Sequence, residues 1–306
     1  MKYIFAFEEN NITYIKGKQK GSELVIYDLK TFSLSEDWSN FSYQKQVDEI
    51  YSALAETVAA LKLKNKKVEL ILSSKGMMFR ELMLPKVRKS QLHSLINNEL
   101  QYYYNNIDDY VVDFIETEKY NNEGKHGYIV YAIRKDNFKV LVNALEKLSL
   151  KVDSANVICL SFKKLANFFY GNEKNYVTAI FDKEYFAMFC YENQNCVLMR
   201  WFKINAMDYW NGEAFSSDKL SEQVARIIHF GRSRNPQGGL KTLFIVDNLG
   251  KEESIAEVLK ADLEKNGIAD VNTVLMDLTD KIVFKNDIKP EDKNFQLYCS
   301  EIVKAG

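Results

Sequence analysis

Acidic side chains at two predicted strand ends are the residues whose type and position could support catalysis. Glu8 and Glu9 follow the apolar run 3–7, and Asp182 follows the run 176–181. A carboxylate at a strand end is a candidate magnesium ligand, although a solvated turn aspartate gives the same pattern. Glu8 and Glu9 are adjacent, so on an extended chain they point to opposite faces and cannot act together as acid and base. We expect turn charges at both positions.

Histidine and cysteine give little support for a metal or redox site. The three histidines lie far apart in the sequence and show no HxH or HxxxH spacing: His93, His126 and His229. The four cysteines include no CxxC pair: Cys159, Cys190, Cys196 and Cys299. Cysteines this sparse in a chain of this length indicate structural thiols in a reducing compartment. We therefore predict no bound metal.

A basic, glycine-bearing loop is a candidate anion site. Arg232 and Arg234 precede the pair Gly238-Gly239, and backbone without Cβ atoms can approach an anion closely. A glycine pair after a helix also marks a simple turn. Both interpretations remain open on the sequence.

Exposed aromatic residues could mark a surface that binds a partner. Tyr102, Tyr103 and Tyr104 end a predicted helix, and three consecutive side chains cannot all face one core. At least one is therefore exposed, which suits an interface as well as simple packing at the helix end. Trp201 and Trp210 are expected to serve packing and not to stack on bases.

Composition places the chain among globular proteins of two domains or one large α/β unit. The 306 residues are 46% hydrophobic and 27% charged, and 41 basic residues nearly cancel 42 acidic ones. No global field therefore favours nucleic acid. Charges at Glu8 and Glu9 come too early for a signal peptide, and about 18 uncharged apolar residues never run together. We expect a cytoplasmic protein.

Hydrophobic periodicity predicts the same order of strands and helices in both halves of the chain. The first half is predicted to hold strands at 3–7, 11–16 and 23–27, a helix at 47–63, a strand at 68–72, a compact α/β stretch to 148, a strand at 152–157 and a helix at 160–169. The second half is predicted to hold strands at 176–181, 187–191 and 196–204, a helix at 220–230, a strand at 242–246, a helix at 254–263, a strand at 271–275 and a helix at 295–303. This repeated βββαβα order predicts an α/β, actin-like (ribonuclease H-like) fold of two lobes.

The predicted lobes are interrupted by one insertion. We expect a first lobe at 1–75 and 154–175, a small α/β insert at 76–153, and a second lobe at 176–306.

Four blocks of sequence resemble the PilM family of type IV pilus assembly proteins. The first block has an arginine before Leu-Pro-Lys, then a helix with a glutamate, then a strand ending in aspartate and an aromatic residue: Arg80, Leu84 to Lys86, Glu99, Tyr102, Asp113 and Phe114. Blocks 145–157, 227–233 and 243–250 follow in family order. The resemblance spans nearly the whole chain and implies the actin-like ATPase fold.

The sequence departs from that family at all three nucleotide loops. Such ATPases hold phosphates on glycine-containing turns. The turn at 7–11 has no glycine and adds the charges of Glu8 and Glu9, the turn at 181–185 has no glycine after Asp182, and the third keeps one glycine, Gly250. Segment 206–219 also replaces a longer helical insert. We therefore predict no catalytic residues and no ATP or magnesium cofactor.

The resemblance implies a scaffold that grips the short N-terminal tail of a single-pass, PilN-like inner-membrane protein. The family groove lies between the first lobe and its insert, which makes five residues candidate partner contacts: Arg80, Leu84, Glu99, Tyr102 and Asp113. An extended peptide could bind there by main-chain pairing. Two alternatives remain: an ATP-binding actin-fold enzyme or nucleotide switch of the sugar or acetate kinase kind, and a scaffold like the cytoplasmic domain of a type II secretion protein of the GspL kind.

Overall fold

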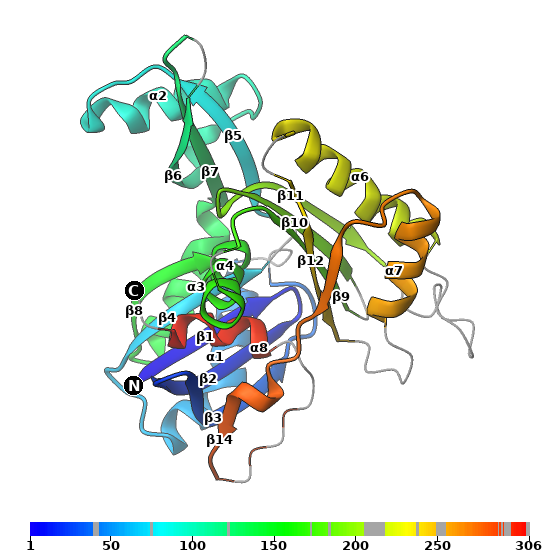
Figure 1. Cartoon of the computed structure of the whole chain (residues 1–306). Coiled ribbons are helices and arrows are strands. Elements are labelled where there is room, and N and C mark those ends of the chain that lie inside the picture. The colour runs from blue at the N-terminus through cyan, green and yellow to red at the C-terminus, as the bar shows by residue number, and fades with distance from the viewer. Residues whose placement is uncertain are drawn as a thin grey trace. The chain divides into compact units, whose positions relative to one another are not determined.

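A computed structural model shows two compact units, and each is described separately (Figure 1). The structure describes residues 1–38, 43–73, 76–120, 123–171, 173–182, 185–204, 218–236, 239–248, 255–286, 288, 290 and 295–303. The first unit comprises Met1–Lys164, Val283–Pro290 and Leu297–Gly306, and the second comprises Leu165–Ile282 and Glu291–Gln296.

The first unit is built on a sheet of order β14-β3-β2-β1-β4-β8. Its strands are β1 (Lys2–Glu8), β2 (Asn11–Lys20), β3 (Glu23–Ser33), β4 (Lys67–Ser73), β8 (Lys151–Val157) and β14 (Ile282–Phe284). Strand β2 is antiparallel to both β1 and β3, whereas β4 is parallel to β1 and β8 is parallel to β4. The predicted opening of three strands, a helix and a buried strand is confirmed.

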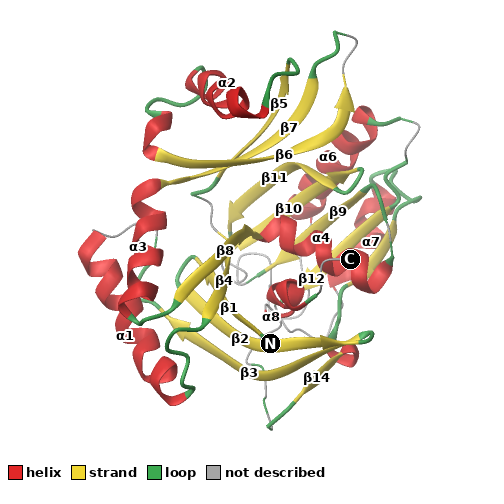
Figure 2. Ribbon diagram, turned by 90° about the vertical axis from the view of Figure 1, so that its left-hand side faces the viewer, coloured by secondary structure: helices red, strands yellow, loops and turns green. Residues whose placement is uncertain are grey.

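Helices α1 (Tyr43–Ala60) and α3 (Lys135–Lys147) pack side by side on this sheet (Figure 2). Apolar residues of α1 recur at helical spacing and are buried: Val47, Ile50, Leu54 and Val58. They share one core with Phe5 and Phe7 of β1 and with Leu141 and Leu145 of α3. Burying this apolar stripe against the sheet is what holds the two helices in place.

The insert is a three-stranded antiparallel sheet covered by a helix on one face (Figure 2). It contains β5 (Met78–Leu84), α2 (Lys89–Gln101), a short 3-10 helix (Ile107–Asp109), β6 (Tyr110–Tyr120) and β7 (His126–Arg134), and the strand order is β5-β7-β6. Leu92, Ile96 and Leu100 of α2 share a small core with Leu82 and Leu84 of β5. Both β5 and β6 therefore lie at edges of this sheet.

The second unit repeats the strand order of the first around a sheet of order β11-β10-β9-β12-β13. Its elements are β9 (Tyr176–Phe181), β10 (Tyr185–Glu192), β11 (Asn195–Lys203), α6 (Asp218–Arg234), β12 (Thr242–Asp247), α7 (Ile255–Lys265) and β13 (Asn272–Leu275). The strands β9, β10 and β11 are antiparallel, and β12 and β13 continue in parallel, as β4 and β8 do in the first sheet. The predicted internal repeat is confirmed.

The remaining described elements connect or close these sheets. They are α4 (Ile158–Tyr170), the 3-10 helices Thr279–Lys281 and Cys299–Ile302, and α8 (Phe295–Tyr298). In the part of the chain that the structure describes, no helix is long and apolar enough to cross a membrane.

The boundaries of the units differ from the predicted ones in three ways. Helix α3, which was predicted to belong to the insert, shares the core of α1 and the first sheet. Val283–Pro290 and the residues from Leu297 onward, predicted to close the second lobe, belong to the first unit. The second unit begins at Leu165 instead of residue 176. Periodicity shows that a segment has an apolar face, but it does not show which core that face joins.

Candidate functional site

An open cavity of about 280 Å³ lies within the first unit, between the insert sheet and the main sheet. It is lined by the end of β4, by β6 and β7 of the insert, and by α3, β8 and α4; the main contributors are Leu72, Val111, Asp113, Tyr131, Ile133, Phe138, Ala155, Asn156, Val157 and Leu160. The volume is close to the lower end of the range typical of ligand pockets. Most of these side chains are apolar, and Asp113 supplies a carboxylate.

Strand alternation explains how the insert contributes to this cavity. Tyr110, Val112 and Phe114 of β6 pack against α2. The intervening Val111 and Asp113 therefore face the opposite side of the sheet, since successive side chains on a strand alternate. Asp113 lies directly opposite Tyr131 of β7. The face that α2 leaves uncovered is thus the one that lines the cavity.

Two sheet edges border the cavity. Strand β6 is an end strand of the insert sheet, and β8 is an end strand of the main sheet. Val111 of β6 is 36% exposed. An edge strand presents backbone N–H and C=O groups that can pair with an added strand. This arrangement suits an extended peptide whose side chains enter an apolar pocket.

Of the five predicted partner contacts, Asp113 lines the cavity and the other four lie elsewhere. Leu84 is 2% exposed in the small core beneath α2, and Arg80 lies on the same face of β5, with its guanidinium carbon 3.3 Å from the centre of the Tyr103 ring. Glu99 is half-buried on α2, and Tyr102 at the end of that helix is 83% exposed. The predicted set is therefore divided between the two faces of the insert sheet.

Most of the cavity wall lies outside the predicted set of partner contacts. That set does not include the apolar lining residues Val111, Tyr131, Ile133 and Phe138. The alternation within 110–114 was the available signal, since it separates Val111 and Asp113 from the three residues that face the helix.

The first turn that would bear phosphate in an actin-like ATPase is tied by backbone hydrogen bonds to the segment that follows β3. Glu8 pairs with Asn11 at the end of the β1–β2 hairpin. The backbone N–H of Trp38 donates to the carbonyl of Glu9 (2.9 Å), and that of Leu34 donates to the carbonyl of Asn10 (2.6 Å). Trp38 is 1% exposed and its ring packs edge-on against Phe7.

The second such turn is held by an asparagine. Asp182 donates its backbone N–H to the carbonyl of Tyr185 (3.0 Å), and its Oδ2 accepts a long hydrogen bond of 3.5 Å from Asn248 Nδ2. The backbone N–H of Asn248 also donates to the carbonyl of Phe181. These contacts give the Asp182 carboxylate a role in the turn. Gly250, the remaining glycine of the third loop, lies outside the described residues, as does nearly all of segment 206–219.

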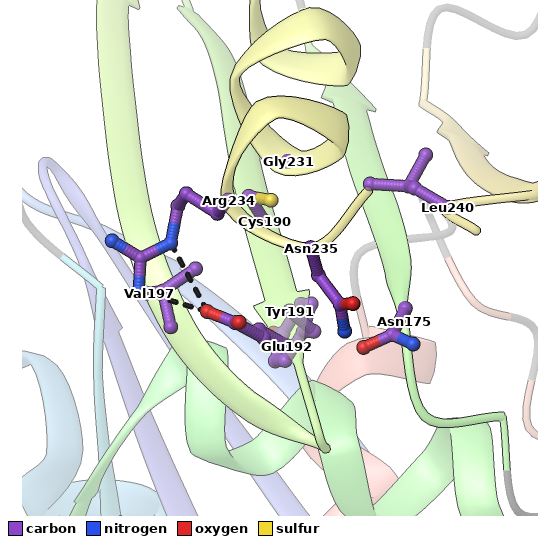
Figure 3. A pocket seen from close by; sticks show the side chains of 9 residues that line it. All are labelled: Asn175, Cys190, Tyr191, Glu192, Val197, Gly231, Arg234, Asn235 and Leu240. Atoms are coloured by element: carbon purple, nitrogen blue, oxygen red, sulfur yellow. Dashed lines mark hydrogen bonds and ion pairs between the residues drawn. The ribbon is translucent and has the colours of Figure 1, made fainter. Parts of the chain in front are cut away.

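The arginines of the candidate anion loop are engaged by carboxylates. Arg232 Nη2 lies 2.7 Å from Asp270 Oδ1. Arg234 donates from Nε (3.0 Å) and Nη2 (2.8 Å) to Glu192 Oε2, beside a cavity of about 10 Å³ that could hold one water (Figure 3). Both cations therefore have carboxylate partners, which favours the turn interpretation. Gly238 lies outside the described residues.

Two of the three histidines and one tryptophan make packing or pairing contacts, and the third histidine, His229, is exposed on α6. The His93 ring packs edge-on against Phe114, and His126 Nδ1 lies 2.9 Å from Glu116 Oε1. Trp201 stacks on Tyr185, as the packing prediction required, whereas Trp210 lies outside the described residues. Within the described part of the chain, no group of three His, Cys, Asp or Glu side chains could hold a metal ion.

The exposed tyrosines are confirmed. Tyr102 and Tyr103 are 83% and 49% exposed, whereas Tyr104 is half-buried against the core beneath α2.

The repeated strand order and the inserted subdomain define a protein of the actin-like fold. Among solved structures, the chain is similar to the PilM–PilN type IV pilus biogenesis complex, with a TM-score of 0.71, 12% identity, and coverage of 99% of this chain and 94% of that chain. It is also similar to the cytoplasmic domain of EpsL, an inner-membrane component of the Vibrio cholerae type II secretion system, with a TM-score of 0.52, 8% identity, and coverage of 98% and 92%. No protein-family model and no curated protein sequence matches the chain. At these identities the similarity concerns the fold.

Proposed function

We propose that this chain is a non-catalytic assembly scaffold that holds the extended cytoplasmic tail of an inner-membrane protein in the cavity of its first unit. The observation that carries the proposal is the position of two sheet edges, β6 and β8, on either side of one apolar cavity. Main-chain pairing to an edge supplies affinity, and side-chain pockets supply selectivity.

Particular residues suit this role. Val111, Ile133 and Phe138 would receive apolar side chains of the tail, and the Asp113 carboxylate would accept hydrogen bonds from a basic side chain or a free backbone N–H. The named similarity to a PilM–PilN complex supports a PilN-like partner in a type IV pilus, secretion or competence machine. The protein would then be cytoplasmic and would reach the inner membrane through its partner.

The absence of catalysis is part of the proposal. It is supported by the lack of glycine in the turn at 7–11, whose carbonyls are bonded to Leu34 and Trp38, and by the asparagine contact of Asp182. The alternative is an actin-fold ATP-binding enzyme or nucleotide switch. A thermal-shift titration with ATP or ADP and magnesium separates the two, because a ligand of the folded state raises apparent stability. We expect no shift at millimolar nucleotide, and a saturable rise would put the alternative first.

Photo-crosslinking tests the proposed peptide site. A benzoylphenylalanine residue is placed at Val111, which faces the cavity, or at Tyr102, which lies at the end of α2. With the PilN-like protein of the same genome co-expressed, we expect crosslinking from position 111 and none from 102. Crosslinking from 102 alone would place the partner on the α2 side.

Substitutions give the same distinction in solution. Val111→Glu should weaken binding of the synthetic tail peptide at least about tenfold in calorimetry, because it places a charge against the apolar wall. Tyr102→Glu is the matched control and should leave binding unchanged, since that side chain is exposed outside the cavity. Equal affinities for both variants and the wild-type chain would contradict the proposal.

A further inference from the structure

The second unit carries its own open cavity of about 290 Å³, formed by α6 and the strands β10 and β11. Its apolar lining comes from Met188, Leu198, Ile227 and Phe230. Its polar lining comes from Arg200 of β11 and from Gln223 and Arg226 of α6. A cavity with an apolar lining and two guanidinium groups suits a ligand that has both apolar and anionic groups.

The fold explains why these groups meet. Arg200 lies directly opposite Met188 in the β10–β11 ladder, and Leu198 is two residues earlier on the same strand, so all three share a face. On α6, Arg226 and Phe230 are four residues apart and therefore neighbours on one side of the helix. Helix α6 packs against β10, which places its side chains over this face of the sheet.

Strand β11 is also an edge. Among the described residues its only sheet neighbour is β10. Leu198, Met199, Trp201 and Phe202 of this strand are all only partly buried. A long edge strand with accessible apolar side chains is a template for an added strand.

The charges select the kind of added strand. Arg200 is exposed and has no ion-pair partner within the described part of the chain. Arg226 contacts Glu222 at 3.7 Å, with both side chains mostly exposed, and such a pair is readily exchanged for another carboxylate. Guanidinium groups bind carboxylates in a planar, two-point geometry. The arginines therefore favour an acidic partner.

We propose that this groove binds an extended acidic segment of a protein partner, added as a strand to β11. Every second side chain of the segment would face α6, with apolar residues against Leu198 and Phe230 and carboxylates against Arg200 and Arg226. The proposal does not depend on the tail site of the first unit, because all of these residues belong to the second unit. The chain would then join two partners through two separate peptide grooves.

A designed peptide tests the groove. The probe is a fluorescein-labelled octapeptide that repeats Asp-Thr-Leu-Thr, so that acidic and apolar side chains alternate on one face, and the control repeats Lys-Thr-Leu-Thr. We expect saturable anisotropy for the acidic peptide and at least about tenfold weaker binding for the basic one. Equal binding of the two peptides, or none up to millimolar protein, would overturn the proposal.

Variants of the full chain locate the binding. The double substitution Arg200→Glu with Arg226→Glu should weaken binding of the acidic peptide about tenfold or more. Lys260→Glu is the matched control, because it also reverses an exposed charge of the second unit but lies on α7, outside the groove. Hydrogen exchange of the backbone amides in β11 should become slower when the peptide binds. Protection confined to β6 or β8 would place the peptide in the first unit and overturn this assignment.

Discussion

Gly17 of β2 and Ile302 of the C-terminal 3-10 helix approach each other so closely that a Cβ atom on Gly17 would lie 2.3 Å from Ile302 Cδ1. Ile302 is 2% exposed, and the same Cβ would lie 3.1 Å from the Val25 carbonyl. Glycine at this position therefore allows the end of the chain to dock on the first sheet. The approach ties residues almost 300 positions apart into one unit.

Gly17→Ala is expected to lower the free energy of unfolding by about 1–3 kcal/mol, because the added methyl group overpacks the site. Urea unfolding followed by circular dichroism measures the loss. In an Ile302→Ala background the same change should cost less, since the clashing atoms are gone. Equal costs in both backgrounds would show that the two residues are not coupled.

The buried Glu301 carboxylate is expected to hold the C-terminal 3-10 helix against α4. It is 4% exposed, accepts from Lys164 Nζ at 2.5 Å and accepts from Ser161 Oγ at 3.2 Å. Glu301→Gln keeps the shape but removes the charge, and should destabilise the protein by about 1–3 kcal/mol. Denaturant unfolding tests this. Ser161→Ala removes only the longer hydrogen bond and should lower the free energy of unfolding by less than Glu301→Gln does. A larger decrease for Ser161→Ala would contradict this ranking.

The cysteine thiols are expected to be unreactive in the native protein. All four cysteines are buried. Burial raises the pKa of the Cys190 thiol to about 12; the Arg234 guanidinium opposes this increase and the Glu192 carboxylate adds to it. Because the thiolate is the reactive form, Ellman's reagent at pH 8 should label the native protein slowly and all four thiols in denaturant. Fast labelling of one native thiol would reveal local opening around it.

The Asp48 carboxylate is expected to make stability depend on acid pH. A hydrogen bond from Lys147 of α3, and a weaker one from Gln44, hold the pKa of Asp48 below its ordinary value. A carboxylate whose pKa is lower in the folded than in the unfolded protein stabilises the fold. This contribution is fully present at pH values above the unfolded pKa of about 3.9, and it is lost as the pH falls through the pKa of the folded protein. Asp48→Asn should therefore weaken the protein slightly at pH 7.

Urea unfolding of the two proteins at pH 7 and near pH 3 measures that difference. The difference in free energy of unfolding between the wild-type and Asp48→Asn proteins should be smaller at the lower pH, because the wild-type carboxylate then takes up a proton. An equal difference at both pH values would mean that the contact with Lys147 does not lower the pKa of Asp48 in solution.

Local patterns in the sequence determined most of the fold. The short apolar run 3–7 and the helical spacing of Val47, Ile50, Leu54 and Val58 specify a buried strand and an amphipathic helix, because each pattern follows the geometry of a single element. Local patterns also predict the repeated order of strands and helices. The lack of glycine near Glu8 and Asp182 is visible in the sequence as well, since residue type alone decides whether a turn can bring its backbone close to phosphate.

Only the tertiary structure decided which surfaces meet. Arg80 and Asp113 belong to the same block of sequence, yet strand alternation and the docking of α2 place them on opposite faces of one sheet. Helix α3 packs in the same core as α1, and Ile302 packs against Gly17. Periodicity identifies the buried side of each element, whereas the partner that buries it depends on contacts between residues far apart in the chain, which local sequence does not encode.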